Sequence, residues 1–378
     1  MSEELSVMED SQNLSLFYEC GIYFFEDSNA VFMDPVRVLN RSYNRFREAR
    51  PLLLEAQERL VKSNELLDAL STFRSDSRGT VRECEGSQHS FVQLGREAPL
   101  LEVTLNSRVC HPDADPHHPP NDFEESPSVC CEQRVLPAFN NLVANDTKDD
   151  VVAEILNNHY IIPRESCFYM SDLRQIRNLL PAHADSGFNL IIVDPPWENA
   201  SAHQKSRYPT LPNRYFLSLP IKQLTHTEGA LVALWVTNRE KLRSFVEREL
   251  FPAWGVSFAA NFYWLKVKEN GSLICDLDLF HHRPYECLIL GYSPGKVSNT
   301  NVQPKFKPVK NDRVIMSIPA DYSRKPPIAD LLLEYIPGLK PPRCIELFAR
   351  EIMAGWVAWG NEPLCFQDSR YFVKVMDK

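Results

Sequence analysis

The strongest constraint on the fold of this chain is the stretch Leu190–Trp197, which reads L-I-I-V-D-P-P-W. Its four apolar residues form a short, mostly β-branched run, a pattern typical of a buried strand. Because proline cannot continue a sheet ladder, the pair Pro195-Pro196 predicts that the strand stops at Asp194. Ligands of open α/β sheets bind at the carboxyl ends of strands. The stretch therefore places a carboxylate, a rigid turn and a large aromatic ring at an expected binding site.

The composition of the whole chain narrows its class. With 378 residues, it is long enough for two or three units, at least one with a full α/β core. Its formal net charge of −9 excludes a globally basic nucleic-acid binder, so any such contact needs a local basic patch. Ten cysteines without a secretory signal favour a reducing, intracellular compartment. No apolar stretch approaches the roughly 20 residues that span a bilayer, so we expect no membrane partner.

The first region, residues 1–73, is expected to be an N-terminal accessory region. Two apolar runs within Leu14–Pro35 are separated by polar residues, which predicts a β-hairpin. Leucines at helical spacing predict a helix over Pro51–Phe73. The first region is therefore predicted as a hairpin followed by a packing helix.

The second region, residues 74–150, lacks periodicity and is rich in polar and turn-forming residues, which predicts a linker or a partly disordered region. A zinc site is an alternative for part of it, because six potential ligands lie close in sequence: Cys110, His111, His117, His118, Cys130 and Cys131. Their spacing fits no Cys-x-x-Cys…His pattern, so we favour a loop with incidental thiols and predict no metal site.

The third region, residues 151–378, is expected to form the main domain. It begins with a predicted helix over Val151–His159, and from about Cys167 strands and helices alternate. That alternation indicates an α/β fold with a mostly parallel, doubly wound sheet. Neither a G-x-G-x-x-G nor a P-loop sequence occurs, which excludes those two phosphate-binding motifs.

The D-P-P-W turn suits a planar base that carries an amino group. The Asp194 carboxylate and the Pro195 carbonyl supply two acceptors for the two N–H groups of such an amine. The two successive prolines stiffen that carbonyl, and Trp197 can stack on the base, a contact worth about 1–3 kcal/mol. We expect catalysis at such a site to rest on positioning and electrostatics rather than on a strong base.

This turn after an apolar strand resembles the signature of the DPPW-type adenine-N6 methyltransferases, the family of the eukaryotic messenger-RNA adenosine methyltransferase. Further blocks follow in family order: Leu234–Arg239 (L-W-V-T-N-R), Arg324–Pro326 (R-K-P), Glu346–Arg350 (E-L-F-A-R) and Gly360–Glu362 (G-N-E). The resemblance covers about Cys167–Glu362. It implies a Rossmann-like, permuted methyltransferase fold in which the catalytic strand precedes the cofactor strand.

The resemblance also implies S-adenosylmethionine as the cofactor and methyl transfer to N6 without a metal. By motif match, the catalytic residues would be Asp194, Pro195, Pro196 and Trp197. The residues implied at the cofactor are Asp172, Asp194, Lys325, Glu346, Leu347, Arg350, Asn361 and Glu362, with Lys325 pairing with the cofactor carboxylate. Two positions depart from the family pattern, since Glu362 stands where relatives often carry Gln and Ala349 where they often carry Gly.

The residues expected at the substrate are Lys205, Arg207 and Tyr208 in a loop after the catalytic turn, and Trp235, Asn238, Arg239, Tyr285 and Glu286. Structural roles compete with this interpretation, with Trp235 as a core residue and Glu286 paired with Arg283. The resemblance implies an RNA partner, small nuclear RNA with a 2′-O-methyladenosine target, and a monomer located in the nucleus, with the cytoplasm as the alternative. Two other functions stay open: a DNA adenine methyltransferase, and a catalytically inactive RNA-binding scaffold.

Overall fold

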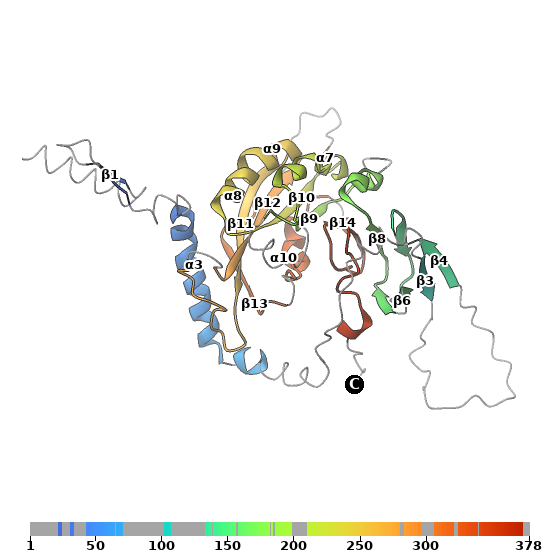
Figure 1. Ribbon diagram of the computed structural model, residues 1–378, viewed down its shortest axis with the longest axis horizontal. Coiled ribbons are helices and arrows are strands. Elements are labelled where there is room, and N and C mark those ends of the chain that lie inside the picture. The colour runs from blue at the N-terminus through green and yellow to red at the C-terminus, as the bar shows by residue number, and fades with distance from the viewer. Residues whose placement is uncertain are drawn as a thin grey trace, which may run out of the picture.

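The computed structural model of the chain (Figure 1) describes residues 22–24, 31–33, 43–64, 66–70, 102–106, 133–137, 139–155, 158–181, 183, 186–198, 210–279, 283–295, 306–320, 324–338 and 340–372. Within these ranges, no helix is both long enough and apolar enough to cross a membrane. The predicted N-terminal hairpin is present, because β1 (Ile22–Phe24) pairs antiparallel with β2 (Val31–Met33). The cysteines and histidines of residues 110–131 lie outside the described residues.

A nine-stranded sheet forms the centre of the molecule, in the order β13-β11-β12-β10-β9-β14-β15-β8-β5. In chain order its strands are β5 (Leu142–Asn145), β8 (Ser166–Met170), β9 (Leu190–Val193), β10 (Ala230–Val236), β11 (Ser257–Lys266), β12 (Tyr285–Ser293), β13 (Arg313–Ser317), β14 (Cys344–Leu347) and β15 (Trp356–Gly360). Within this sheet β5 and β12 run against the other strands. The prediction of a mostly parallel α/β sheet is therefore confirmed.

Helices cover both faces of this sheet (Figure 1). One face packs against α7 (Ile221–Leu224), α8 (Glu240–Phe245), the π-helical turn η4 (Val246–Leu250) and α9 (Phe251–Trp254). The other face packs against α10 (Ala329–Leu332) and the 3-10 turn η6 (Leu333–Tyr335). Further 3-10 helices are η1 (Leu173–Leu179), η3 (Asn213–Ser218) and η7 (Ser369–Tyr371). Because β9 is buried on both faces, its four residues are all apolar.

The chain changes direction across the sheet at β9. From β9 it proceeds to β10 on one side, and it returns later to β14 on the other side. Both neighbours are parallel to β9. After β9 the chain continues to β10 on one side, and after β14 it continues to β15 on the other side, so the two connections leave the carboxyl ends of β9 and β14 in opposite directions. Such a switch point leaves a crevice where α/β folds bind ligands.

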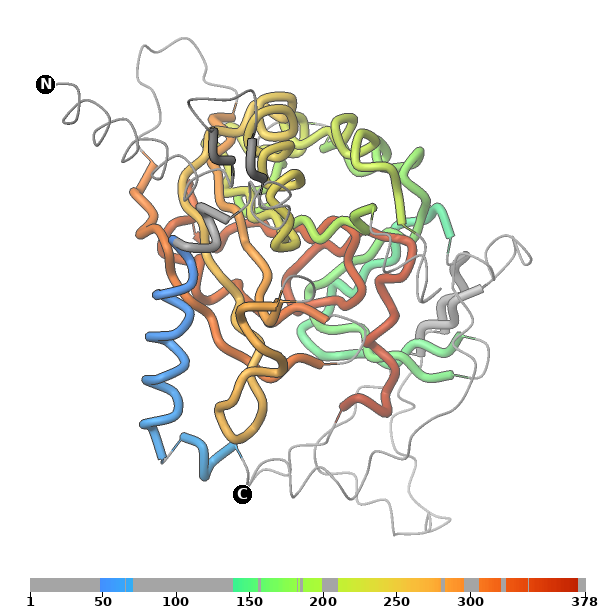
Figure 2. The backbone as a smooth tube through the Cα atoms, turned by 60° about the vertical axis from the view of Figure 1, so that its left-hand side comes forward, coloured from blue at the N-terminus to red at the C-terminus, as the bar shows by residue number. Residues whose placement is uncertain are grey.

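Helix α3 (Tyr43–Lys62) lies far from the sheet in sequence but beside β11 and β13 in space (Figure 2). Ala49 and Leu53 are each 1% exposed and belong to the main core. The Arg50 guanidinium holds the Asp278 carboxylate through two hydrogen bonds of 2.7 Å. The predicted helix over residues 51–73 is thus correct in kind, but α3 begins eight residues earlier and ends before residue 73.

Residues 151–155 and 158–162 are two strands, so the predicted helix over 151–159 is wrong. β6 (Val151–Ile155) pairs antiparallel with β7 (Asn158–Ile162) in a second sheet of order β4-β3-β6-β7. The other two strands of that sheet are β3 (Glu102–Asn106) and β4 (Gln133–Pro137). Along β6 every second side chain is buried, which is the period of a strand and not of a helix.

The central sheet starts before residue 151, the expected start of the main domain. β5 pairs with β8 at the edge of the sheet and lies inside the expected linker of residues 74–150. Val143 of β5 is fully buried against β6, β7 and β8. This part of the expected linker is therefore an ordered strand.

Candidate active site

Charged side chains gather at one edge of the central sheet, where the parallel strands end. Asp194 follows β9 directly, and Lys266 is the last residue of β11. β12 runs in the opposite direction, so Glu286, its second residue, lies at this same edge. The switch point between β9 and β14 lies at this edge as well.

The strand register places these side chains on one face of the sheet. Ile192 and Trp264 belong to the apolar cluster that packs against α10. Asp194 follows Ile192 by two residues and therefore points to the same side. Glu286 is the direct partner of Trp264 across β12 and β11, and Lys266 follows Trp264 by two residues. The three charged groups thus converge above one apolar face.

Lys325, four residues before α10, completes a chain of alternating charges. Its Nζ lies 3.1 Å from Asp194 Oδ1 and 3.3 Å from Glu286 Oε2. Lys266 Nζ lies 2.5 Å from Glu286 Oε1. The four side chains are between 14% and 17% exposed. We call this set, Lys266–Glu286–Lys325–Asp194, the charged chain.

The neighbours of the two inner groups keep them ionised. Burial by itself lowers the pKa of Lys325, but the Asp194 and Glu286 carboxylates raise it above its ordinary value. Burial by itself raises the pKa of Glu286, but Lys325 and Lys266 hold it below its ordinary value. Arg283, the other partner considered for Glu286, donates from Nε to the Leu279 carbonyl at 3.0 Å.

The D-P-P-W turn is held by hydrogen bonds from its own backbone and from its tryptophan. The Trp197 N–H donates to the Pro195 carbonyl at 2.8 Å. The indole Nε1–H of Trp197 donates to the Trp235 carbonyl at 2.8 Å. Trp197 is 6% exposed, so its ring is not an open surface in this structure. Trp197 therefore anchors the turn here, in contrast to the base stacking that the sequence suggests.

We expect Trp197→Phe to destabilise the protein by about 1–3 kcal/mol, because the buried hydrogen bond to the Trp235 carbonyl is lost while an aromatic ring is kept. Urea unfolding followed by circular dichroism measures this difference. An unfolding midpoint equal to that of the wild type would contradict the anchoring role.

Most of the residues expected at the cofactor lie in the last residues of β14 or just after β8, β9, β14 and β15, at the same edge. The Asp172 carboxylate caps η1 by accepting a hydrogen bond from the Arg174 N–H at 2.7 Å. β8 and β15 are neighbours, so Asp172 lies at the edge next to Asn361 and Glu362, which follow β15. The structure thus brings these three side chains to one side of the switch point.

β14 ends in a strained turn beside the D-P-P-W turn. Phe348 has a φ of 62°, in the left-handed region that residues with a side chain rarely adopt. The side chain of Leu347 is fully buried, and its carbonyl accepts a hydrogen bond from the Asp194 N–H at 3.2 Å. The Arg350 guanidinium lies 5.4 Å from the centre of the Phe366 ring. The turn at Phe348 therefore leads from the buried end of β14, the neighbour of β9, to Arg350.

Glu346, in β14 beside the switch point, is a carboxyl group with an unusual pKa. It is the direct partner of Ile192 across β14 and β9 and so shares the face of the charged chain. Burial, together with the carboxylates of Glu351 and Asp194, raises the pKa of Glu346 to about 8. Glu346 therefore carries a proton at neutral pH and can donate a hydrogen bond.

The raised pKa of Glu346 predicts a pH-dependent stability. The unfolded chain releases this proton near pH 4.5, whereas the folded protein holds it up to about pH 8. Its contribution to stability is thus complete below pH 4.5 and is lost as the pH rises through this window. Glu346→Gln cannot ionise, so its stability relative to the wild type should rise by up to about 1.4 kcal/mol per pH unit. Urea unfolding of both proteins across the window tests this, and a constant difference would contradict it.

The expected substrate residues of β10 and β12 have structural contacts. Trp235 is 1% exposed and packs edge-on against Trp264, with ring centres 5.8 Å apart. Asn238 Nδ2 donates to the Tyr285 carbonyl at 3.1 Å. Tyr285 is 4% exposed, and burial raises the pKa of its phenol. Arg239 lies at the start of α8. Trp235, Asn238 and Tyr285 thus join the strands at this edge, and the Trp235 carbonyl accepts the hydrogen bond from the indole of the D-P-P-W turn.

The loop residues Lys205, Arg207 and Tyr208 lie outside the described residues. Lys266 is a site residue that the motifs do not indicate. A lysine at the end of a strand is a weak signal, and its partner Glu286 becomes visible only through the register of β11 and β12. Among the described residues, no group of three or more His, Cys, Asp or Glu side chains is arranged to hold a metal ion.

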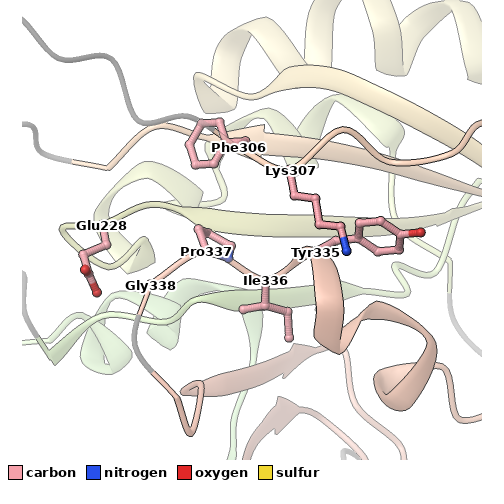
Figure 3. Close-up of a pocket in the computed structure, with 7 residues that line it drawn as sticks. All are labelled: Glu228, Phe306, Lys307, Tyr335, Ile336, Pro337 and Gly338. Atoms are coloured by element: carbon pink, nitrogen blue, oxygen red, sulfur yellow. The ribbon is translucent and has the colours of Figure 1, made fainter.

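A cavity of about 380 Å³ has a lining that includes no residue of the charged chain, and Figure 3 shows its lining residues. Glu228, which precedes β10, forms one end of it, so the cavity lies at the amino edge of the parallel strands. Its other lining residues are Phe306, Lys307, Tyr335, Ile336, Pro337 and Gly338. The edge with Asp194 is the opposite one, so this cavity is not part of the candidate active site.

Comparison with known proteins identifies the domain that carries this site. Residues 188–362 match the MT-A70 family. They are an MT-A70 domain. This confirms the family resemblance, and the MT-A70 domain includes the whole charged chain.

Several relatives of this MT-A70 domain bear names of N6 methyltransferases. The chain is 36% identical over 244 residues to mouse N(6)-adenine-specific methyltransferase METTL4, covering 64% of this chain and 50% of that protein. It is 33% identical over 228 residues to N6-methyladenosine RNA methyltransferase MTA1 of Pyricularia oryzae, covering 58% of each. It is 31% identical over 240 residues to a DNA N6-methyl methyltransferase of Caenorhabditis elegans, covering 62% of each. The chain spans about half the length of the METTL4 proteins that it matches.

Proposed function

We propose that this chain is an S-adenosylmethionine-dependent N6-adenine methyltransferase that acts on RNA, at a 2′-O-methyladenosine of small nuclear RNA. One observation carries the proposal. The carboxylates of Asp194 and Glu286 approach the same nitrogen atom, Lys325 Nζ, at 3.1 and 3.3 Å. Lys325 thereby holds the Asp194 carboxylate at the end of β9, where it can accept an N–H group of an amine such as the amino group of adenine.

The side chains at β8, β14 and β15 fit the chemistry of S-adenosylmethionine. The cations Lys325 and Arg350 suit its carboxylate, and the acid Asp172 suits its ammonium group. Asn361 and the protonated Glu346 offer hydrogen bonds to its ribose hydroxyls. When bound, this cofactor would supply an electrophilic methyl group.

The residues of the D-P-P-W turn would orient the amine. Asp194 accepts one N–H group and the Pro195 carbonyl accepts the other, which aims the nitrogen lone pair. That carbonyl already accepts from the Trp197 N–H at 2.8 Å, and a carbonyl oxygen has a second lone pair for the substrate. After methylation, Asp194 can receive the proton that the nitrogen releases. Positioning of this kind is the main contribution we assign to the chain.

The test is the formation of N6-methylated adenosine by the full chain with S-adenosylmethionine. Three matched oligonucleotides serve as substrates: RNA with a 2′-O-methyl group on the target adenosine, unmodified RNA, and DNA. Mass spectrometry of the digested nucleosides should find the highest turnover on the 2′-O-methylated RNA.

Each other result selects a different function. Higher turnover on DNA would make DNA adenine the substrate, the candidate that the name of the Caenorhabditis elegans relative supports. If no product forms and calorimetry detects no binding of S-adenosylmethionine, the RNA-binding scaffold replaces the enzyme. With small nuclear RNA as the substrate, we also propose a nuclear location and a monomeric enzyme.

A further inference from the structure

Lys266 forms the outer end of the charged chain and is held on two sides. Its Nζ lies 2.5 Å from Glu286 Oε1 and 4.5 Å from the centre of the Trp264 ring. Its side chain is 17% exposed. A carboxylate and an aromatic face both attract an ammonium group, so together they fix its position.

Lys266 determines which carboxylate oxygen of Glu286 contacts Lys325. Because Lys266 takes Oε1, the contact to Lys325 is made by Oε2, at 3.3 Å. Lys325 then reaches Asp194 Oδ1 at 3.1 Å with the same ammonium group. Within the charged chain, two cations therefore balance two carboxylates.

Removal of the Lys266 charge would upset this balance. Lys325 would be the single cation of the charged chain for two carboxylates that are 14% and 15% exposed. A poorly compensated buried carboxylate is costly, so Glu286 would turn both oxygens toward Lys325. Lys325 would then move away from Asp194, and the spacing between the two carboxylates would change.

We propose that Lys266 is a positioning residue for adenine methylation, a role that rests on the proposed function. By holding one oxygen of Glu286, it sets the place of Lys325 between Glu286 and Asp194. Through Lys325 it thereby sets the position of the Asp194 carboxylate, the acceptor at which the adenine amine would be held. Lys266 acts through Glu286 and needs no contact with the substrate.

The first test measures the coupling of Lys266 and Glu286 in the full chain without any substrate. Lys266→Met should lower the thermal unfolding midpoint by about 5 °C or more, since it leaves a buried charge short of a partner. In the background of Glu286→Gln, the same change should lower the midpoint by less than about 2 °C. If Lys266→Met alone does not fold, recovery of folded protein in the double variant is the expected result. Equal losses in both backgrounds would overturn the proposal.

The second test measures methylation of the RNA oligonucleotide. Lys266→Met should lower kcat by about 10- to 100-fold and leave the KM for RNA within about threefold. Lys266→Arg keeps the cation and should restore kcat to within about threefold of the wild type. Lys268→Met is the matched control, because Lys268 lies two residues further on and is exposed. It should leave kcat unchanged.

The outcomes separate this proposal from the proposed function. Equal kcat for the wild type and Lys266→Met, or equal damage from Lys266→Met and Lys266→Arg, overturns the role of Lys266 alone. Absence of methylated adenosine with the wild-type chain overturns the proposed function, and with it any role of Lys266 in methylation. The coupling in thermal unfolding is measured separately from both.

Discussion

Asp194→Asn should lower the rate of N6 methylation by about 100- to 1,000-fold while the protein stays folded. The amide has the size of the carboxylate, but it can place an NH₂ group where the adenine amine needs an acceptor. The change also removes the negative charge that lies 3.1 Å from Lys325 Nζ. Single-turnover assays with excess enzyme measure the rate of the chemical step directly.

The control for Asp194→Asn is Asp330→Asn, which changes an exposed acid on α10 in the same way. It should leave the rate within about twofold, because surface substitutions away from the site have small effects. If Asp194→Asn also stays within about tenfold of the wild type, the amine is held by another group and the role of Asp194 is refuted.

Lys325→Met should destabilise the protein by about 3–5 kcal/mol and abolish methylation. The methionine leaves Asp194 and Glu286 as neighbouring buried carboxylates without the cation that bridges them. Since Lys325 is one of the groups that hold the pKa of Glu286 below its ordinary value, this pKa should rise in the variant. The loss of stability relative to the wild type should therefore be largest at neutral pH. It should become smaller in acid, because the carboxylates take up protons there.

Urea unfolding at neutral and at acidic pH tests this prediction. Lys307→Met is the matched control, because Lys307 also makes an ion pair of 2.5 Å, with Glu334, but both side chains are about half exposed (52% and 50%). An exposed pair of this kind contributes little to stability, because solvent screens it. If the loss of stability in Lys325→Met does not change with pH, the lysine stabilises the protein through packing and not through its charge.

The core of the fold could be predicted from the sequence because the signals there are local. Leu190–Val193 is all apolar since β9 is buried on both faces, and the two prolines end the strand where they stand. The segment Val151–Ile155 is different. Its apolar residues fit a helix or a strand equally well, and the choice is made by pairing with β3 and β7, which local spacing does not reveal.

The candidate site also contains residues that local sequence signals predict and residues that they do not. Asp194 follows from its position after β9, and the family blocks point to Lys325, because both signals lie within a few residues. The role of Trp197 does not follow, since a tryptophan after a turn can stack on a ligand or anchor the turn. Its hydrogen bond to Trp235, 38 residues away, favours the second in this structure. Lys266 likewise requires the register of two strands before its partner is known.

The position of α3 and β8 has a practical consequence for anyone who expresses parts of this protein. A fragment that begins at residue 188 would lack β8, which covers the edge of β15, and α3, whose residues Ala49 and Leu53 pack into the core beside β11 and β13. An open strand edge and a bare apolar surface both promote aggregation. The shortest fragment expected to stay monodisperse therefore starts before Tyr43, although the family match begins at residue 188.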